Sequence, residues 1–499
     1  MHIAFAASEC VPFSKTGGLA DVVGALPRAL AALGHQVSVY LPRYRQTKLA
    51  DPQTVVRSIT IPFDDKYRFC SVVAAGANTP AGIKFYFVDY PPYFDREALY
   101  GSPAGDYPDN AERFALFSRA VLEASKVLGV PHVFHCHDWQ SALVPVMLRT
   151  LYAEDPAFRE VATVFTIHNM GYQGLFSPDT LPLLMLPWDL LTMSKMEFFG
   201  QVNFLKGALV LSDYVTTVSR KYSQEIQTTE YGFGLEGVLR DRAATVTGIL
   251  NGVDYDEWSP QTDKFITAKY SPQDLSGKLQ CKHDLLHAFG VTSADSKVPV
   301  IGIVSRFAAQ KGFDLIAQIM DRLAREEMIV VALGAGDKTY EEMFQRLNKQ
   351  FPNKIATKVA YDNAIAHKIE AGADMFLMPS RYEPCGLNQI YSLKYGTVPI
   401  VRATGGLDDT IEPWDARTGK GTGFKFSDYT GEALLATIKQ ALLAYQDRSS
   451  WQTLMRNGMG RDFSWGASAR EYGKIYERAR QVRASAEAAA DLKKEAVLV

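Results

Sequence analysis

The chain has 499 residues, of which 47% are apolar and 22% are charged. Because a single hydrophobic core stops growing at about 250–300 residues, this length predicts two large domains, and the composition excludes a disordered or fibrous protein. The 53 Lys and Arg residues nearly balance the 55 Asp and Glu residues, so no global positive field exists to hold nucleic acid or an anionic membrane, and we expect neither as a partner.

The start of the chain and its cysteines predict the compartment. Residues 1–5 carry neither the basic segment nor the cleavage site of a secretory signal, and no run of about 18 apolar residues follows. The five cysteines are odd in number and widely spaced, which favours reduced thiols over a disulfide framework. We therefore expect a cytoplasmic protein without a membrane span.

Short β-branched runs alternate with longer helical patterns along the chain. This alternation predicts parallel sheets with helices on both faces, so the expected class is α/β. Apolar residues at three- and four-residue spacing predict helices over residues 315–323 and 433–445. The expected strands are 3–7, 36–41, 133–137, 163–168, 214–218, 298–305, 328–333, 355–360, 375–378 and 398–401.

The alternation pauses over residues 245–296, where turn-forming pairs such as Asn251-Gly252 punctuate a polar stretch. We place the domain junction near residue 243, which predicts Rossmann-like domains over residues 1–242 and 243–464. Open parallel sheets bind ligands beyond the carboxyl ends of their strands. The two sheets are therefore expected to face an interdomain cleft.

The last part of the chain is predicted to form a charged amphipathic helix over residues 465–483 that packs back on the first domain. The Ala/Glu/Lys-rich residues 484–499 have little apolar face, so we expect a flexible, frayed tail. No internal repeat or low-complexity tract interrupts this plan.

A first candidate site follows the first expected strand, where Lys15-Thr16-Gly17-Gly18 leads into a helix. Paired glycines let backbone N–H groups approach a phosphate closely, and Lys15 adds a positive charge beside the helix N-terminus. A tight turn without a ligand is the alternative. The segment is neither a dinucleotide fingerprint nor a P-loop, because the GxGxxG and GxxxxGK[ST] spacings are absent.

Two cations flank a loop in the second half of the chain. Arg306 closes an expected strand, and Lys311 precedes the next helix. Across such a loop the two side chains can converge on one diphosphate, to which Arg306 can make a two-pronged contact. Solvated surface charges are the alternative.

Glu383 stands at the end of a further expected strand. A carboxylate there can hydrogen-bond sugar hydroxyls or balance the positive charge that develops at an anomeric carbon. A charge that stabilises a helix N-terminus is the alternative. Thr404-Gly405-Gly406 follows the last expected strand and forms a second turn whose amides could face a phosphate.

A histidine cluster raises the question of a metal site, because His132, His135, His137 and Asp138 lie within seven residues. On a strand, His135 and His137 share a face while His132 lies outside that alternation, so we predict no metal. His168 ends another expected strand, where a hydrogen-bonded, half-buried histidine is the alternative to a functional one.

Five segments, taken in order, resemble motifs of bacterial glycogen synthases and plant starch synthases, which are glycosyltransferases of the GT-B fold. The resemblance covers nearly the whole chain. It implies two Rossmann-like domains, the first on the side of the acceptor glucan and the second binding the nucleotide-sugar donor. The segments are residues 15–22, 135–139, 250–254, 310–312 and 383–387.

The resemblance implies a retaining glucosyltransferase that moves glucose from a nucleotide sugar to the non-reducing end of an α-1,4-glucan in glycogen biosynthesis. The expected donor is ADP-glucose and the expected acceptor is glycogen. The family also implies a catalytic core without a metal or another cofactor.

The resemblance assigns roles to the matching residues. Arg306 and Lys311 would hold the diphosphate, and Glu383 would lie at the donor glucose. His168 would contact the donor sugar, and Asp138 would lie near the reacting centre. The implied substrate-binding residues are Lys15, Gly17, Gly18, Asp21, Asn251, Cys385, Gly386, Thr404, Gly405 and Gly406.

These roles agree with the charge that the reaction develops. Cleavage of a glycosidic bond to a diphosphate leaves negative charge on the departing oxygens and an oxocarbenium-like sugar. Cations are therefore needed at the departing oxygens, and a carboxylate is needed near the sugar. Two mechanisms stay open for Glu383: attack as a nucleophile, or stabilisation while the acceptor attacks from the leaving-group face.

Three other functions compete with this one. A GT-B transferase that uses a UDP-sugar and a small sugar acceptor is the nearest, and residues 15–21 and 383–386 argue against it. A catalytically silent glucan-binding protein is expected to have lost residues such as Lys15 or Glu383. A dehydrogenase requires a glycine spacing and a ribose-binding carboxylate that follow no strand here.

Overall fold

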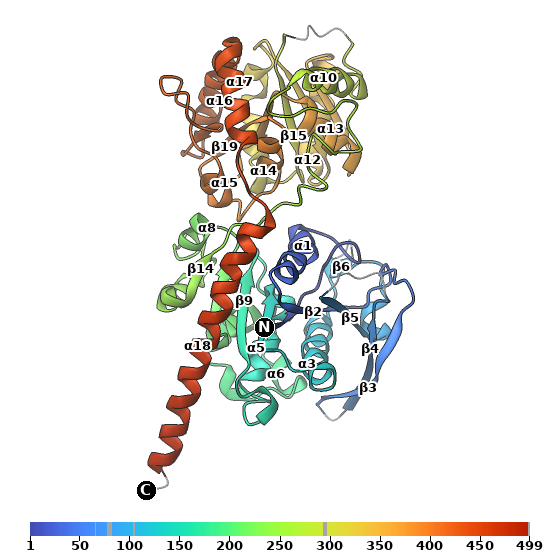
Figure 1. The fold of residues 1–499 in the computed structure, drawn as a ribbon, viewed down its shortest axis with the longest axis vertical. Coiled ribbons are helices and arrows are strands. Elements are labelled where there is room, and N and C mark those ends of the chain that lie inside the picture. The colour runs from blue at the N-terminus through green and yellow to red at the C-terminus, as the bar shows by residue number, and fades with distance from the viewer. Residues whose placement is uncertain (65, 77–81, 103–104, 293–296, 498–499) are drawn as a thin grey trace. The chain divides into compact units, whose positions relative to one another are not determined.

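The computed structural model describes residues 1–497 except 65, 77–81, 103–104 and 293–296 (Figure 1). Its internal contacts divide the chain into two compact units. The first unit comprises Met1–Val218, Ser223–Gly252 and Trp465–Val499, and the second comprises Ser219–Tyr222 and Val253–Ser464.

The first unit is built on one large, mostly parallel sheet. In spatial order its strands are β14 (Val246–Gly248), β13 (Tyr214–Thr217), β9 (Ala162–Ile167), β8 (Val133–His137), β1 (His2–Ala6), β2 (Gln36–Pro42), β5 (Ile83–Asp89), β4 (Lys66–Ala74) and β3 (Gln53–Phe63). The pairs from β14 to β5 are parallel, whereas β4 pairs antiparallel with both β5 and β3. Figure 1 shows β3 and β4 at the edge of this sheet.

Helices cover this sheet in two groups: α1 packs beside α18, and α3 packs beside α5. The shorter strands of this unit are β6 (Gly101–Ser102), β7 (Gly105–Asp106), β10 (Leu175–Phe176), β11 (Glu197–Phe198) and β12 (Gln201–Asn203). Its helices are α1 (Gly18–Ala32), α2 (Pro91–Phe94), α3 (Asn110–Leu128), α4 (Asp138–Ser141), α5 (Leu143–Leu148), α6 (Thr180–Leu183), α7 (Phe204–Leu211), α8 (Arg220–Glu225), α9 (Glu236–Asp241) and α18 (Trp465–Val497), with 3-10 turns at Pro156–Phe158, Trp188–Leu190 and Ala243–Thr245. The first turn of α8 is shared with the second unit.

The second unit carries a smaller, wholly parallel sheet. In spatial order its strands are β17 (Ile355–Val359), β16 (Ile329–Gly334), β15 (Val300–Val304), β18 (Met375–Met378), β19 (Val398–Arg402) and β20 (Phe424–Phe426). Its helices are α10 (Ser276–Ala288), η4 (Ala309–Lys311), α11 (Phe313–Leu323), α12 (Lys338–Gln350), α13 (Asn363–Gly372), α14 (Asn388–Lys394), α15 (Gly405–Thr410), α16 (Gly431–Gln446) and α17 (Arg448–Met459).

Successive residues of β15 show that both faces of the second sheet are covered. Ile301 and Ile303 join an apolar cluster with α11 and α16, whereas Val300 joins a different cluster with α10 and α13. Adjacent side chains of a strand point to opposite faces, so each face of the sheet buries its own core. None of the helices in the described ranges has the length and hydropathy of a membrane span.

The two sheets confirm the expected α/β class, and each predicted strand overlaps an observed one. The strand at 133–137 and the strand at 375–378 coincide with β8 and β18 in their bounds. The antiparallel edge of β3 and β4 was not predicted. Register shifts between Thr54 and Val56 and between Val56 and Ile59 interrupt the alternation by which a strand is found.

The boundary between the units falls after Gly252, later than the predicted junction near residue 243. The cause is β14, which follows that junction but pairs in parallel with β13 and so extends the first sheet. The polar stretch in which the junction was placed ends at 293–296, outside the described residues.

α18 packs in the first unit, where Tyr472 and Tyr476 join the apolar cluster that contains Val22 of α1. The helix was predicted to end near residue 483 but continues to Val497, because Ala, Glu, Lys and Arg all have high helix propensity. Residues 498 and 499, the end of the predicted tail, lie outside the described residues.

Candidate functional site

Lys311 and Glu383 form an ion pair at the carboxyl end of the second sheet. Lys311 ends η4 in the loop after β15, and Glu383 lies in the loop after β18. Lys311 Nζ lies 2.6 Å from Glu383 Oε2, and the hydroxyl of Ser380 donates to the same oxygen at 3.1 Å. The Glu383 side chain is only 7% exposed and that of Lys311 23%, so water reaches the lysine more easily than the carboxylate.

Glycines allow the loops around Glu383 to pack closely. Gly312 has φ +79°, and a Cβ there would lie 2.1 Å from the Pro379 carbonyl oxygen. Gly405 has φ +44°, and its Cβ would lie 1.9 Å from the Glu383 carbonyl oxygen. A left-handed backbone and such close contacts exclude any larger residue at either position without rearrangement. The two glycines therefore set the position of the Glu383 backbone.

The turn at residues 404–406 differs from the expectation that its amides face a phosphate. The amide of Gly406, within α15, donates to the carbonyl oxygens of Glu383 at 3.1 Å and Pro384 at 3.2 Å. This amide is therefore used inside the protein, and the turn supports the Glu383 loop.

Arg306 lies in the same strand-to-helix loop as Lys311 and is exposed. Its Nη2 donates to Gln310 Oε1 at a long 3.3 Å. Asn388, at the start of α14, donates from Nδ2 to the Val304 carbonyl oxygen at 3.0 Å and so joins this loop to the segment after Glu383. Three charged side chains predicted from sequence thus belong to neighbouring loops at one edge of the sheet.

Two of the other predicted residues, Cys385 and Gly386, follow Glu383 in the same loop. Cys385 is buried and is not disulfide-bonded, and Gly386 has φ +69°, a conformation that favours glycine. Thr404, at the N-terminus of α15, is also buried. These residues shape the loop and present no exposed side chain of their own.

Sequence analysis missed side chains that support this edge. Ser380 lies two residues after the end of β18, and its position three residues before Glu383 was a usable signal. Tyr429 gave no local signal: its ring lies 4.4 Å from the Arg381 guanidinium, and its hydroxyl donates to Asp314 at 2.5 Å. That contact depends on segments far apart in the chain.

In the first unit, the turn at residues 15–18 is held by Glu9, which sequence analysis also missed. The amides of Thr16 and Gly17 both donate to Glu9 Oε2, the latter at 3.2 Å, and the Thr16 hydroxyl donates to Oε1 at 2.5 Å. Tyr100 donates to Oε1 at 2.6 Å. Two of the amides expected to face a phosphate are therefore occupied by a buried carboxylate.

Gly17 and Gly18 nevertheless leave open space at the start of α1. Gly17 has φ −150°, which any residue can adopt, and Gly18 is not among the positive-φ glycines. A Cβ on either residue would meet no atom within 4 Å. Neither conformation nor packing requires glycine here, so close approach of a ligand is the remaining physical reason for the pair.

Lys15 and Asp21 stand beside this open space. Lys15 Nζ lies 2.7 Å from Asp21 Oδ1, with both side chains partly exposed. Burial raises the pKa of the Asp21 carboxyl, and Lys15 partly opposes this increase. The pair supplies one cation and one carboxylate at the helix N-terminus.

Asp138 and His168 lie at the carboxyl ends of the adjacent strands β8 and β9. Asp138 has φ +53°, which is uncommon outside glycine, and its Oδ1 accepts the His168 amide at 2.7 Å. Burial raises the pKa of Asp138 to about 7, although backbone amides of His168 and Asn169 favour its charged form. Burial lowers the pKa of His168 to about 3, so its imidazole is neutral at physiological pH.

His135 of β8 and His132, which precedes that strand, both make hydrogen bonds within the fold. His135 Nδ1 lies 2.9 Å from the Tyr476 hydroxyl and its Nε2 lies 2.6 Å from Thr166 Oγ1. His132 Nδ1 accepts the His2 amide at 2.9 Å. Within the part of the chain that the structure describes, no group of three His, Cys, Asp or Glu side chains is arranged to hold a metal ion.

Asn251 lies in the loop after β14 and is buried. Its Oδ1 has no hydrogen-bond partner among the described residues. Gly252 follows, and a Cβ there would lie 2.6 Å from the Trp465 backbone, so this glycine lets the loop pack against the start of α18.

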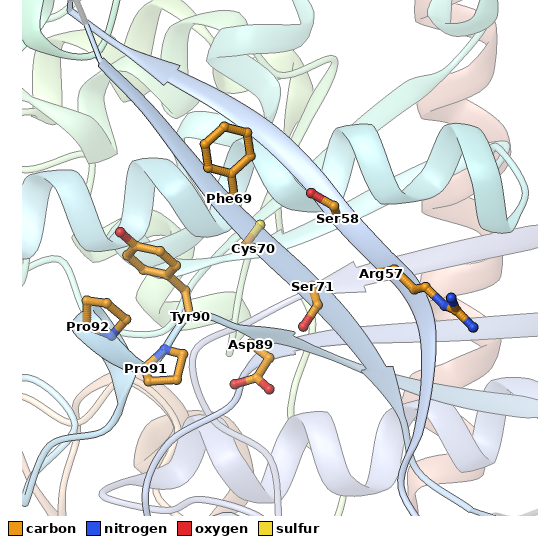
Figure 2. A pocket seen from close by; sticks show the side chains of 9 residues that line it. All are labelled: Arg57, Ser58, Phe69, Cys70, Ser71, Asp89, Tyr90, Pro91 and Pro92. Atoms are coloured by element: carbon orange, nitrogen blue, oxygen red, sulfur yellow. The ribbon is translucent and has the colours of Figure 1, made fainter.

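A separate hollow of about 320 Å³ lies at the antiparallel edge of the first sheet (Figure 2). Figure 2 shows its lining side chains on β3, β4, the end of β5 and the start of α2. None of the predicted site residues lines this hollow. The lining residues are Arg57, Ser58, Phe69, Cys70, Ser71, Asp89, Tyr90, Pro91 and Pro92.

Two family models match the chain in consecutive segments. The model described as the starch synthase catalytic domain matches residues 2–241, and that described as glycosyl transferases group 1 matches residues 288–457. The two matches fall in the first and second unit respectively, apart from residues 219–222.

Similar proteins extend over nearly the whole chain. A glycogen synthase of Koribacter versatilis is 72% identical over 97% of this chain and 99% of its own length, and one of Anaeromyxobacter sp. (strain Fw109-5) is 47% identical over 95% and 99%.

Two solved structures are similar in fold to this chain. The catalytic domain of starch synthase IV from Arabidopsis thaliana, bound to ADP and acarbose, has a TM-score of 0.87 at 34% identity and covers 96% of this chain and 99% of that one. A sucrose-phosphate synthase from Thermosynechococcus elongatus has a TM-score of 0.57 at 19% identity over 97% and 99%, a likeness of fold alone.

Proposed function

The chain belongs to the family of glycogen and starch synthases, and from this premise we propose that it transfers glucose from ADP-glucose to the non-reducing end of an α-1,4-glucan, with retention of anomeric configuration. Membership makes it a GT-B hexosyltransferase that acts on a nucleotide sugar and a glucan. The observation that carries the proposal is the ion pair of Lys311 and Glu383 at the carboxyl end of the second sheet.

In the proposed reaction, the second unit holds the donor. The bond that breaks joins the anomeric carbon to the diphosphate, and the departing oxygens gain negative charge. Arg306 and Lys311 stabilise that charge, Arg306 by a two-pronged contact and Lys311 as a point charge. Glu383 faces the positive charge that develops on the sugar. Lys311 can therefore balance the Glu383 carboxylate before the donor binds and the diphosphate of the donor afterwards.

The remaining residues of the second unit shape the pocket for the donor. Gly405 and Gly406 support the Glu383 backbone, as their close contacts indicate. Cys385 and Gly386 lie in the loop after β18, and Thr404 lies in the loop after β19. We assign these residues to substrate binding because they shape the two loops.

The first unit carries its own residues that we assign to substrate binding. Gly17 and Gly18 leave room for the nucleotide sugar, and Lys15, paired with Asp21, adds a cation beside it. His168 contacts the donor sugar, and Asp138 lies near the reacting centre and holds the His168 backbone. Asn251 has a buried, unpartnered Oδ1, which is consistent with a role in substrate binding.

ADP-glucose is favoured as the donor because the starch synthase domain with the same fold was solved with ADP. We also propose that the protein acts in the cytoplasm, where its buried cysteines, none of which is disulfide-bonded in the described structure, stay reduced.

The test is glucose incorporation into glycogen from ADP-glucose and UDP-glucose in parallel, with EDTA present. We expect incorporation from ADP-glucose to exceed that from UDP-glucose, and Glu383→Ala to lose at least about 100-fold in kcat, as for other groups that stabilise transition-state charge. Glu326→Gln is a matched control, because it breaks an exposed ion pair with Lys439 in the same unit, and it should keep wild-type turnover.

Failure with both donors would contradict the proposal. Transfer from UDP-glucose to fructose or a sugar phosphate, without incorporation into glycogen, would favour the rival GT-B transferase.

A further inference from the structure

His137 is a buried residue to which no role has yet been assigned. It ends β8 and is fully buried, and its Nδ1 lies 3.0 Å from Nε2 of His168. The ring stacks on Phe5 with centroids 5.4 Å apart and an interplanar angle of 16°. Its backbone is fixed by Ser141, whose hydroxyl accepts the His137 amide at 2.6 Å and lies 2.8 Å from its carbonyl oxygen. The His135 ring also lies against it, with centroids 4.2 Å apart, but among the described residues His168 is the hydrogen-bond partner of this imidazole.

The contact between the two rings requires one to donate and the other to accept. Burial lowers the pKa of His137 well below its ordinary value and that of His168 to about 3, so both rings are neutral. A neutral imidazole carries one N–H and one bare nitrogen. One of two arrangements must hold: a proton on His137 Nδ1 or a proton on His168 Nε2.

The second nitrogen of His137 distinguishes these arrangements. His137 Nε2 is buried and has no hydrogen-bond partner in the described part of the chain. If His168 donated, the His137 proton would sit on Nε2 as an orphaned buried N–H, which is rare in proteins. If His137 donates from Nδ1, Nε2 holds only a lone pair. The arrangement in which His137 donates leaves the less costly group unsatisfied.

We infer that His137 is a positioning residue that fixes His168 in the tautomer with its proton on Nδ1. His168 then presents a hydrogen-bond donor on its other ring nitrogen, Nδ1. Unlike His137 Nε2, this nitrogen is not among the buried side-chain atoms that lack a partner in the described part of the chain, and His168 as a whole is only half-buried. This donor suits a hydroxyl or ring oxygen of a sugar. The inference rests on the proposed function for the identity of that sugar, but the tautomer follows from the geometry of the two rings.

The direct test is the tautomer itself, read by NMR of the full chain labelled with ¹⁵N-histidine. Two-bond couplings distinguish protonated from bare ring nitrogens. The chain has nine histidines, and the signals lost in His168→Gln identify those of His168. We expect the proton on Nδ1, and a proton on Nε2 in the wild-type protein would overturn the inference.

Variants of His137 test its effect on the reaction. His137→Asn keeps an N–H near the position of Nδ1, whereas His137→Leu removes it. We expect His137→Leu to lose about 10- to 100-fold in kcat/KM for the nucleotide sugar, the range seen when a group that orients a functional histidine is removed. His137→Asn should recover most of that loss and keep the Nδ1 tautomer of His168.

A double-mutant cycle separates positioning from general structural damage. If His137 acts through His168, the loss caused by His137→Leu should largely vanish in a His168→Gln background. Fully additive losses in folded variants would overturn the inference. A wild-type chain that transfers no glucose would instead overturn the proposed function, and the NMR result would still decide the tautomer.

Discussion

The ion pair of Lys311 and Glu383 should couple the two residues in stability as well as in activity. Removal of one member of a buried pair costs about 3–5 kcal/mol, because the other charge is left without compensation. The two members here differ in exposure, with 7% for Glu383 and 23% for Lys311. The two single substitutions should therefore have unequal costs.

Lys311→Met leaves the carboxylate with the Ser380 hydroxyl as its described donor. We expect this change to destabilise the second unit by about 2–4 kcal/mol. Glu383→Gln leaves a lysine that can reach water, so its cost should be only about 1–2 kcal/mol. The double variant removes both charges and should lie within about 1 kcal/mol of the wild type, even though it is inactive.

Hydrogen exchange at the amides of β15 and β18 measures the opening free energy of the second unit separately from that of the first. Lys439→Met is the control, since its pair with Glu326 is exposed and should contribute about 0–1 kcal/mol. A coupling energy below about 0.5 kcal/mol between Lys311 and Glu383, or a larger cost for Glu383→Gln than for Lys311→Met, would refute this reasoning.

Three further predictions concern glycines, pH and the C-terminal helix. Gly405→Ala should lower the free energy of unfolding by at least about 1–3 kcal/mol and remove most of the activity, because Gly405 has a positive φ and lies close to the Glu383 carbonyl oxygen. Gly17→Ala should instead keep thermal stability and raise the KM for the donor. Equal losses of stability in the two variants would contradict this contrast. Burial raises the pKa of Asp138 to about 7 from an ordinary 3.8. Between about pH 4 and 7, the native state therefore keeps a proton that the unfolded chain has lost. The contribution of this carboxyl to stability falls as pH rises through that window. Asp138→Asn should flatten that decline in urea titrations by a few kcal/mol at most, and an unchanged pH dependence would count against the raised pKa. Deletion of residues 484–499 should lower Tm by less than about 3 °C, since Arg159, which pairs with Glu487 and Asp491 of this segment, is 51% exposed. A larger decrease in a thermal scan would show a structural role.

The elements that local pattern could reveal were found from sequence. Buried parallel strands are short apolar runs between helices, so β8 and β18 were located with their observed bounds. The charged residues after those strands were candidates because ligands bind at carboxyl ends of parallel strands. The antiparallel edge escaped because the shifts in register around Val56 hide its alternation.

Other features depend on contacts between distant segments. The amides of Thr16 and Gly17 looked free for a phosphate, but Glu9 accepts both. Glu9 lies three residues after β1, in the same loop as the turn that it holds. α18 continues past the predicted end near residue 483 because the high helix propensity of its residues outweighs the lack of an apolar face.

By itself, the sequence determined the class of fold and the family, because periodicity and ordered motifs are local properties of the chain, and it supplied the candidate residues of the site. Only the tertiary structure decided how those residues are used. Lys311 and Glu383 are 72 positions apart, and their 2.6 Å contact exists because parallel strands bring their carboxyl ends to one edge of the sheet. The contact between His137 and His168 arises in the same way between β8 and β9, since pairing of strands, unlike their existence, is fixed by the packing of the whole unit.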